Sequence, residues 1–196
     1  ADENSSKERK FIRSLAEQQA EGIIAAPLSK HDRESFEMLK KYDIPVVFVD
    51  KYIEGFEADR VITDNYLGGE IVAEYLLSLG HRDIALCKGY GWNTTSTYFR
   101  EQGFVNCLRR HGVPGWEELE FENPLDHAMK YAYQATQKRL IKGSVSFTAI
   151  FCFTDNMAAG CIRALLEAGL RVPEDVSVVG YNDDDFCKYH PIALTT

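Results

Sequence analysis

Apolar and polar positions alternate along the chain in two patterns, one typical of buried strands and the other of amphipathic helices. Short continuous apolar runs, the pattern of parallel strands buried on both faces, occur at 21–27, 44–50, 83–89, 147–154 and 176–182, with weaker candidates at 60–63 and 119–123. Segments with apolar residues three and four positions apart lie at 33–42, 65–81, 96–112, 127–143 and 155–169. The pattern therefore predicts strands and helices in regular alternation.

The beginning of the chain adds one more helix to this pattern. Ser5 precedes Glu8 by three residues, the spacing of a capping box at a helix N-terminus. Phe11, Ile12 and Leu15 follow at helical spacing, so residues 5–20 are expected to form a helix with these three on one face.

Alternating strands and helices of this length predict an α/β fold in which helices flank parallel sheets. Ligands of such folds bind outside the carboxyl ends of the strands. Polar residues stand at several of these ends: Asp50 follows one apolar run, Thr154 and Asp155 another, and Asn182 begins an acidic run after a third. The sequence therefore places its candidate chemistry at one rim.

Composition and charge limit the function classes. The 196 residues are 45% hydrophobic and 27% charged, an ordinary globular composition with no apolar run of membrane-spanning length. The polar start "ADENSSKERK" has no apolar core of a secretory signal, so a cytoplasmic location is expected. A net charge of -8 argues against nucleic-acid binding by this segment, because phosphate contacts depend on Lys and Arg.

The five cysteines are scattered and form no C-x-x-C pair. This spacing suggests neither a disulfide framework nor a zinc site, and small buried side chains are expected at these positions. The cysteines are Cys87, Cys107, Cys152, Cys161 and Cys187.

Several separate stretches together resemble the effector-binding core of the LacI/GalR family of bacterial transcription regulators. They are "TDNYLGGEIVAEYLLSLGHRDIAL", the R-x-x-GF of Arg100, "TAIFCFTDNMAAGCIRALLEAGLRVPEDVSVVGYNDDD" and the closing "PIALTT". They occur in the same order as in the family and cover nearly the whole chain.

The resemblance implies a two-lobed fold of the type I periplasmic-binding-protein kind, with an effector, usually a sugar, between the lobes. Residues 1–63 would be a partial N-terminal lobe, 64–192 the C-terminal lobe, and 193–196 the start of a crossover back. Family cores begin earlier and continue further, so this one is expected to be incomplete at both ends. The family also implies a homodimer and operator DNA bound by a helix-turn-helix headpiece that is not in this sequence.

The resemblance also implies the effector contacts, which are carried over to Asp50, Thr94, Ser96, Arg100, Thr154 and Asn182. Planar side chains with two polar atoms suit the vicinal hydroxyls of a sugar. The family most often has Asp at the position of Asn182, so a different hydroxyl pattern is expected. Trp92 is added because an indole ring beside the Thr94 loop could pack on the apolar face of a sugar.

Each candidate has a structural alternative. Arg100 could pair with Glu101 or another surface carboxylate, and Asp155 could cap the helix that follows it. The acidic run from Asp183 to Asp185 is expected to be a solvated helix start rather than a ligand cage.

Three functions remain open at this point. An effector-binding regulator core, working by a population shift between lobe orientations, is favoured, and no metal, cofactor or membrane contact is expected. A periplasmic-type sugar receptor shares the fold. A carbohydrate-active enzyme would need paired carboxylates such as Asp50 and Asp155, but no nucleophile or metal-ligand set accompanies them.

Overall fold

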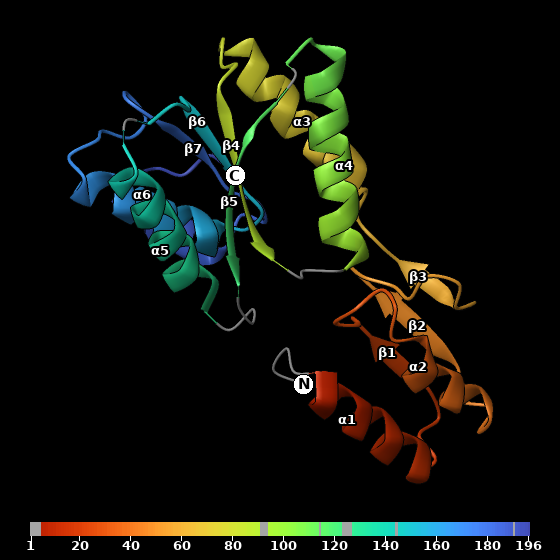
Figure 1. The fold of residues 1–196 in the computed structure, drawn as a ribbon. Coiled ribbons are helices and arrows are strands. Elements are labelled where there is room, and N and C mark those ends of the chain that lie inside the picture. Colours follow the sequence, from red (N-terminus) through yellow and green to blue (C-terminus); the bar gives the residue numbers. More distant parts are fainter. Residues whose placement is uncertain (1–4, 91–93, 114, 123–126, 144, 190) are drawn as a thin grey trace.

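The computed structural model describes residues 5–90, 94–113, 115–122, 127–143, 145–189 and 191–196. Figure 1 shows two lobes, each built around its own parallel sheet. We call the part around strands β1 to β3 the first lobe and the part around β4 to β7 the second lobe. The predicted α/β class with parallel sheets flanked by helices is confirmed.

The first lobe has a three-stranded sheet in the order β1-β2-β3. Its elements are α1 (Ser5–Glu17), β1 (Ile23–Ala25), α2 (Arg33–Lys40), β2 (Val46–Val49) and β3 (Asp59–Val61). Three buried rings, Phe36, Phe48 and Phe56, meet edge to face with centroids 5.3 to 6.1 Å apart and form its core with Ile12 and Leu39.

The apolar residues that share one face of α1 are not all buried. Ile12 is buried, but Phe11 is 57% exposed and Leu15 37%. The buried stripe runs instead through Glu8, Ile12 and Ala16, at successive four-residue steps. Glu8 can be buried because its carboxylate accepts the backbone N–H of Leu28 at 3.1 Å, a long-range contact that a local pattern does not reveal.

The face of this sheet that points away from the Phe36 core is open. Ile24, Val49 and Val61 are exposed, and Val49 and Val61 are register partners in neighbouring strands. The first lobe thus presents an apolar sheet surface to solvent.

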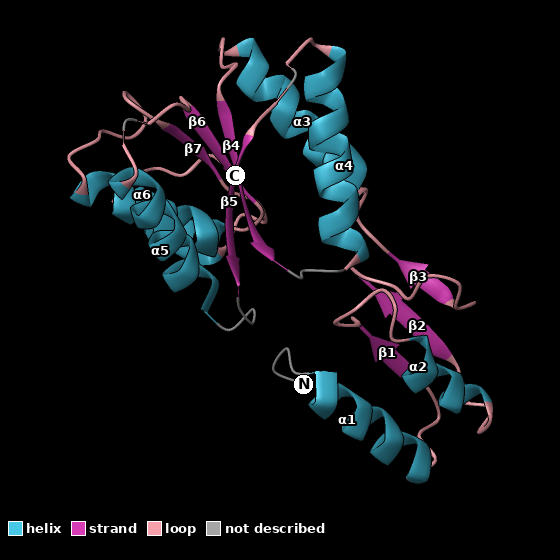
Figure 2. Ribbon diagram, in the orientation of Figure 1, coloured by secondary structure: helices cyan, strands magenta, loops and turns pink. Residues whose placement is uncertain are grey.

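The second lobe has a four-stranded parallel sheet in the order β5-β4-β6-β7. Helices α3 and α4 cover one face and α5 and α6 the other (Figure 2). The elements are α3 (Asn65–Ser78), β4 (Ile84–Tyr90), α4 (Thr95–Arg110), β5 (Glu117–Glu122), α5 (Ala128–Ile141), β6 (Ala149–Cys152), α6 (Asp155–Glu167) and β7 (Ser177–Val179).

The central strands β4 and β6 are buried on both faces, which explains their continuous apolar sequences. All five cysteines are free and buried, which confirms the expectation that they are small core side chains. The predicted lobe boundary after residue 63 falls between β3 and α3 and remains a prediction. A short 3-10 helix, η2 (Asp185–Tyr189), follows β7, and Thr195 near the end of the chain forms an isolated bridge with Val179.

Helices α3 and α4 approach each other closely at two glycines. A Cβ added at Gly69 would lie 2.0 Å from the carbonyl oxygen of Arg100, and one at Gly103 would lie 1.9 Å from that of Tyr66. Only glycine fits at either place. Because Arg100 lies at this close crossing, the packing of α3 against α4 fixes the position of its backbone.

The direct contacts between the lobes that the described residues make include two polar ones. The ammonium of Lys30 lies 3.8 Å from the ring centroid of Tyr98, and the backbone N–H of Tyr52 donates to the hydroxyl of Thr95 at 3.1 Å. Among the described residues, no helix is long and apolar enough to cross a membrane.

Candidate functional site

A cavity of about 820 Å³ lies where residues of the two lobes meet. The side chains that line it include all the predicted effector contacts that the structure describes, namely Asp50, Thr94, Ser96, Arg100, Thr154 and Asn182. Trp92 lies outside the described residues. Positions more than a hundred residues apart in the sequence therefore converge on one hollow at the carboxyl ends of the strands, and their role in binding stays a prediction.

Asp50 is the contribution of the first lobe. It directly follows β2, and its φ of 64° lies in the left-handed region that few residues other than glycine adopt. Its backbone N–H donates to Val61 at 3.0 Å, and its side chain is about half exposed, 4.0 Å from the ammonium of Lys51. The β2 end thus holds a solvated carboxylate at the cavity wall in a conformation that costs free energy.

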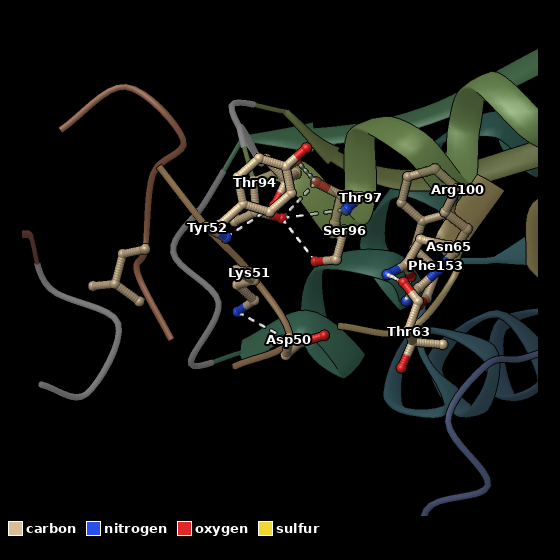
Figure 3. A network of polar contacts seen from close by, with 12 residues as sticks. Asp50, Lys51, Tyr52, Thr63, Asn65, Thr94, Ser96, Thr97, Arg100 and Phe153 are labelled. Atoms are coloured by element: carbon tan, nitrogen blue, oxygen red, sulfur yellow. Dashed lines mark hydrogen bonds and ion pairs between the residues drawn. The ribbon is translucent and has the colours of Figure 1, made fainter. Parts of the chain in front are cut away.

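Three hydroxyls meet at the N-terminus of α4. Thr94 is the N-cap residue, and its Oγ1 accepts the backbone N–H of Thr97 at 3.3 Å. The same oxygen lies 3.1 Å from the hydroxyl of Ser96 and 2.9 Å from that of Thr97 (Figure 3). All three are buried, so Thr94 and Ser96 line the cavity as members of a cap that already satisfies part of their hydrogen-bonding capacity.

Arg100 is buried, with 6% of its surface exposed. One terminal nitrogen donates to the carbonyl oxygen of Phe153 at 2.5 Å and the other to the side-chain oxygen of Asn65 at 2.7 Å (Figure 3). The guanidinium also lies over the ring of Tyr181, 3.4 Å from its centroid. The alternative of a surface ion pair is therefore wrong.

The remaining nitrogen of Arg100, Nε, is buried and has no hydrogen-bond partner among the described residues. Burial lowers the pKa of Arg100 from its ordinary value, although nearby acidic groups act in the opposite direction. An unpaired donor on a buried cation is costly, and a ligand oxygen in the cavity would remove that cost.

Thr154 caps α6. Its Oγ1 accepts the backbone N–H of Met157 at 3.3 Å, so the expectation that Asp155 is the cap is wrong by one residue. Asp155 is fully buried, and its carboxylate accepts the backbone N–H of Asp184 at 2.8 Å. Thr154 therefore combines a structural role with a place in the cavity wall, and Asp155 holds the loop after β7.

The loop after β7 carries the last cavity residues. Asn182 has a φ of 111°, an unusual backbone conformation that brings it to the cavity. Asp184 also lines the cavity, and burial followed by the nearby Asp155 raises its pKa. Asp185 begins η2 and is exposed. The expectation of a solvated acidic run thus holds for Asp183 and Asp185, which are exposed, but not for Asp184, which lines the cavity.

The sequence did not reveal the two residues whose side chains hold Arg100 in place. Asn65 is the first residue of α3, and its sequence context indicates only an ordinary helix start. The sequence context of Tyr181 indicates only the end of a strand. The only available signal was that each is a polar or aromatic residue at an element end, where parallel α/β folds collect their sites.

Comparison with known proteins agrees with this geometry. The family model described as a periplasmic binding protein-like domain matches residues 73–196. The HTH-type transcriptional repressor PurR of Vibrio parahaemolyticus is 35% identical over 195 residues, which cover 97% of this chain and 56% of the repressor. The chain thus spans just over half the length of such curated relatives.

Two solved structures share the fold. The first is a LacI family transcriptional regulator from Enterococcus faecium with bound ribose, which is 30% identical with a TM-score of 0.80 and covers 94% of this chain and 67% of its own. The second is a sugar-binding LacI family regulator from Escherichia coli complexed with phosphate, which is 25% identical with a TM-score of 0.79 and covers 97% and 67%.

Proposed function

Since the chain belongs to the periplasmic-binding-protein-like domain family, as the effector-binding core of a LacI/GalR-type regulator, we propose that its cavity binds a sugar or sugar derivative. We further propose that this binding controls the affinity of a helix-turn-helix headpiece for operator DNA. The relatives described above are repressors and regulators rather than enzymes. They agree with the expectation that the chain has no catalytic activity.

The proposal rests on one observation, which is that residues of both lobes line the same cavity. Asp50 from the first lobe and Arg100, Thr154 and Asn182 from the second all line it. Its volume of about 820 Å³ is in the range of small-molecule sites and has room for a monosaccharide with water.

The polar groups in the wall suit a polyhydroxylated ligand. Asp50 offers acceptors, Arg100 offers a buried donor, and Asn182 offers one of each. A sugar needs donors and acceptors a few ångströms apart, and charged partners make the stronger of these bonds. The ribose and the phosphate in the two related structures support a sugar or a phosphorylated sugar as the first class to test.

Control of DNA binding would follow from unequal affinity for two lobe orientations. A ligand held by Asp50 on one side and Arg100 on the other favours the orientation in which both reach it. Such a movement would have to break or rearrange the contacts of Lys30 with Tyr98 and of Tyr52 with Thr95. In a homodimer the movement would change the spacing of two headpieces.

A thermal-shift screen of monosaccharides and phosphosugars tests the proposal, because a bound ligand raises stability by RT ln(1 + [L]/Kd). The hit is then titrated by calorimetry into the wild type, Asp50→Ala and the control Asp59→Ala, an exposed carboxylate on β3 that does not line the cavity. We expect one site, weakened at least tenfold by the first substitution and unchanged by the control. Equal affinity in all three proteins would contradict binding between the lobes.

A periplasmic-type sugar receptor is the alternative within the same fold. The residues that precede Ala1 in the full protein separate the two: a helix-turn-helix indicates a regulator and an apolar leader indicates a receptor.

A further inference from the structure

A second cluster of chemically active side chains lies outside the cavity, where α3 and α4 run side by side in the second lobe. Cys107 and His111 are four residues apart at the C-terminal end of α4, and Glu74 faces them from α3. Residues four apart share one side of a helix, so both α4 residues face the same neighbour. One oxygen, one sulfur and one nitrogen ligand atom here lie within 4.8 Å of one another.

The hydrogen bond of the His111 ring fixes which nitrogen is available. Its Nδ1 lies 3.0 Å from the carbonyl oxygen of Cys107 and 3.7 Å from the Sγ of the same residue, and because a carbonyl can only accept, we assign the proton to Nδ1. In the neutral ring Nε2 then presents a lone pair. Histidines that bind metals usually donate their second ring N–H in this way, which sets both tautomer and ring orientation.

The neighbour of Nε2 is another acceptor. Oε2 of Glu74 lies 3.5 Å from it, so with a neutral ring the two lone pairs face each other unless a proton or a cation lies between them. Zinc bonds to nitrogen and oxygen are about 2.0 to 2.2 Å long, and tetrahedral geometry then puts the two ligand atoms about 3.4 Å apart. The observed separation fits a shared metal ion.

We propose that Glu74, Cys107 and His111 bind one Zn²⁺ ion, with solvent water completing a tetrahedral site. Thiolate, imidazole and carboxylate are all established zinc ligands, and the two negative ligands balance the charge of the ion. Glu74 and His111 are 49% and 42% exposed, which leaves a path for the ion to enter. The absence of a C-x-x-C pair gave no sign of such a site, because its third ligand comes from a different helix.

The surrounding charges set the conditions for binding. Arg110 hydrogen-bonds to Glu70 and lies 3.9 Å from Glu74, so it competes weakly for the carboxylate. An ordinary cysteine thiol has a pKa of about 8.5 and is therefore mostly protonated near pH 7, whereas zinc binds the thiolate. Formation of the Zn–S bond therefore releases this proton to solvent, and zinc affinity is expected to rise with pH.

The test is a titration of the chelator-treated protein with ZnCl₂, followed by calorimetry in two buffers of different ionisation enthalpy. We expect one Zn²⁺ per chain and release of close to one proton. His111→Ala and Glu74→Gln change exposed side chains and are expected to weaken binding at least tenfold. His81→Ala, which removes another histidine of the same lobe that bonds to Thr148, is the matched control and should bind as the wild type does.

Cobalt supplies an independent readout of the sulfur ligand. Co²⁺ in the wild type should give a thiolate-to-metal charge-transfer band that Cys107→Ser lacks, while the other four cysteines are unchanged. The proposal is overturned if no stoichiometric Zn²⁺ binds, if His111→Ala binds as tightly as His81→Ala, or if the wild type shows no thiolate band. Should Cys107→Ser fail to fold, the His111 and Glu74 variants still decide the outcome.

Discussion

The guanidinium of Arg100 lies over the ring of Tyr181, with its central carbon 3.4 Å from the ring centroid. With hydrogen bonds to Phe153 and Asn65, this contact holds the cation in place while Nε stays unpaired. The orientation of Arg100 is thus set before any ligand arrives. A preorganised donor of this kind costs less entropy on binding than one that must be ordered by the ligand.

Arg100→Ala should weaken effector binding by at least about 1.5 kcal/mol, the scale of a hydrogen bond to a charged group. Arg100→Lys should recover only part of the loss, because an ammonium lacks the planar fork that reaches two acceptors at once. Calorimetry with the ligand found in the thermal-shift screen measures both. Arg109→Ala, an exposed change on the same helix, serves as the control, and unchanged affinity in Arg100→Ala would remove this residue from the site.

The position of Tyr181 depends on a glycine of α3. A Cβ at Gly68 would lie 2.0 Å from the Tyr181 hydroxyl and 3.0 Å from the ring carbon that bears it. Gly68→Ala should therefore push the ring away from Arg100 and weaken effector binding several-fold, the scale of one cation–π contact.

The double variant Gly68→Ala with Tyr181→Phe distinguishes this steric cause from a general loss of helix packing. Without the hydroxyl the closest contact becomes the one at 3.0 Å, so part of the affinity should return. No recovery in the double variant would show that Gly68 acts by another route.

The crossing of α3 and α4 should be intolerant of any side chain at Gly103. Its added Cβ would meet the backbone of Tyr66 at 1.9 Å, and a backbone cannot rotate away as a side chain can. Gly103→Ala should therefore destabilise the protein by about 1–3 kcal/mol in urea unfolding. Gly115→Ala, whose Cβ would meet nothing within 4 Å, is expected to leave stability nearly unchanged. Similar midpoints for the two variants would contradict the close crossing.

The order of strands and helices could be predicted because it depends on local patterns. β6 at Ala149–Cys152 is apolar at every position, and α4 at Thr95–Arg110 has its apolar residues at helical spacing. Asp50 and Asn182 could be placed at the carboxyl ends of their strands by the same patterns. These inferences need only the period of the sequence and the topology that it implies, whereas the meeting of two separate sheets at one cavity was implied only by the family resemblance.

What could not be predicted depends on contacts between distant segments. Glu8 rather than Phe11 lies on the buried side of α1, because the Glu8 carboxylate accepts a hydrogen bond from Leu28, twenty residues away. The cap of α6 fell on Thr154 rather than Asp155 because the carboxylate of Asp155 is used by Asp184. The site near His111 escaped notice because α3 supplies Glu74. In each case the deciding partner is far away in the sequence.

The partly buried setting of Asp184 should make stability depend on pH. Burial, then the nearby Asp155, raises its pKa above the ordinary value of 3.8, so the native state favours the protonated form. The stability that the protonated form contributes is present below the ordinary pKa and is lost as the pH rises through the native-state value.

Asp184→Asn carries no charge and keeps an oxygen that can accept from Asn156, which donates to Asp184 at 3.3 Å. At pH 7 it should therefore melt at a higher temperature than the wild type, and the difference should shrink toward pH 3.8 and vanish below it. Asp185→Asn, an exposed change that loses an ion pair with Lys188, should show no such gain. A gain for Asp184→Asn that persists at low pH would mean that its cause is packing rather than charge.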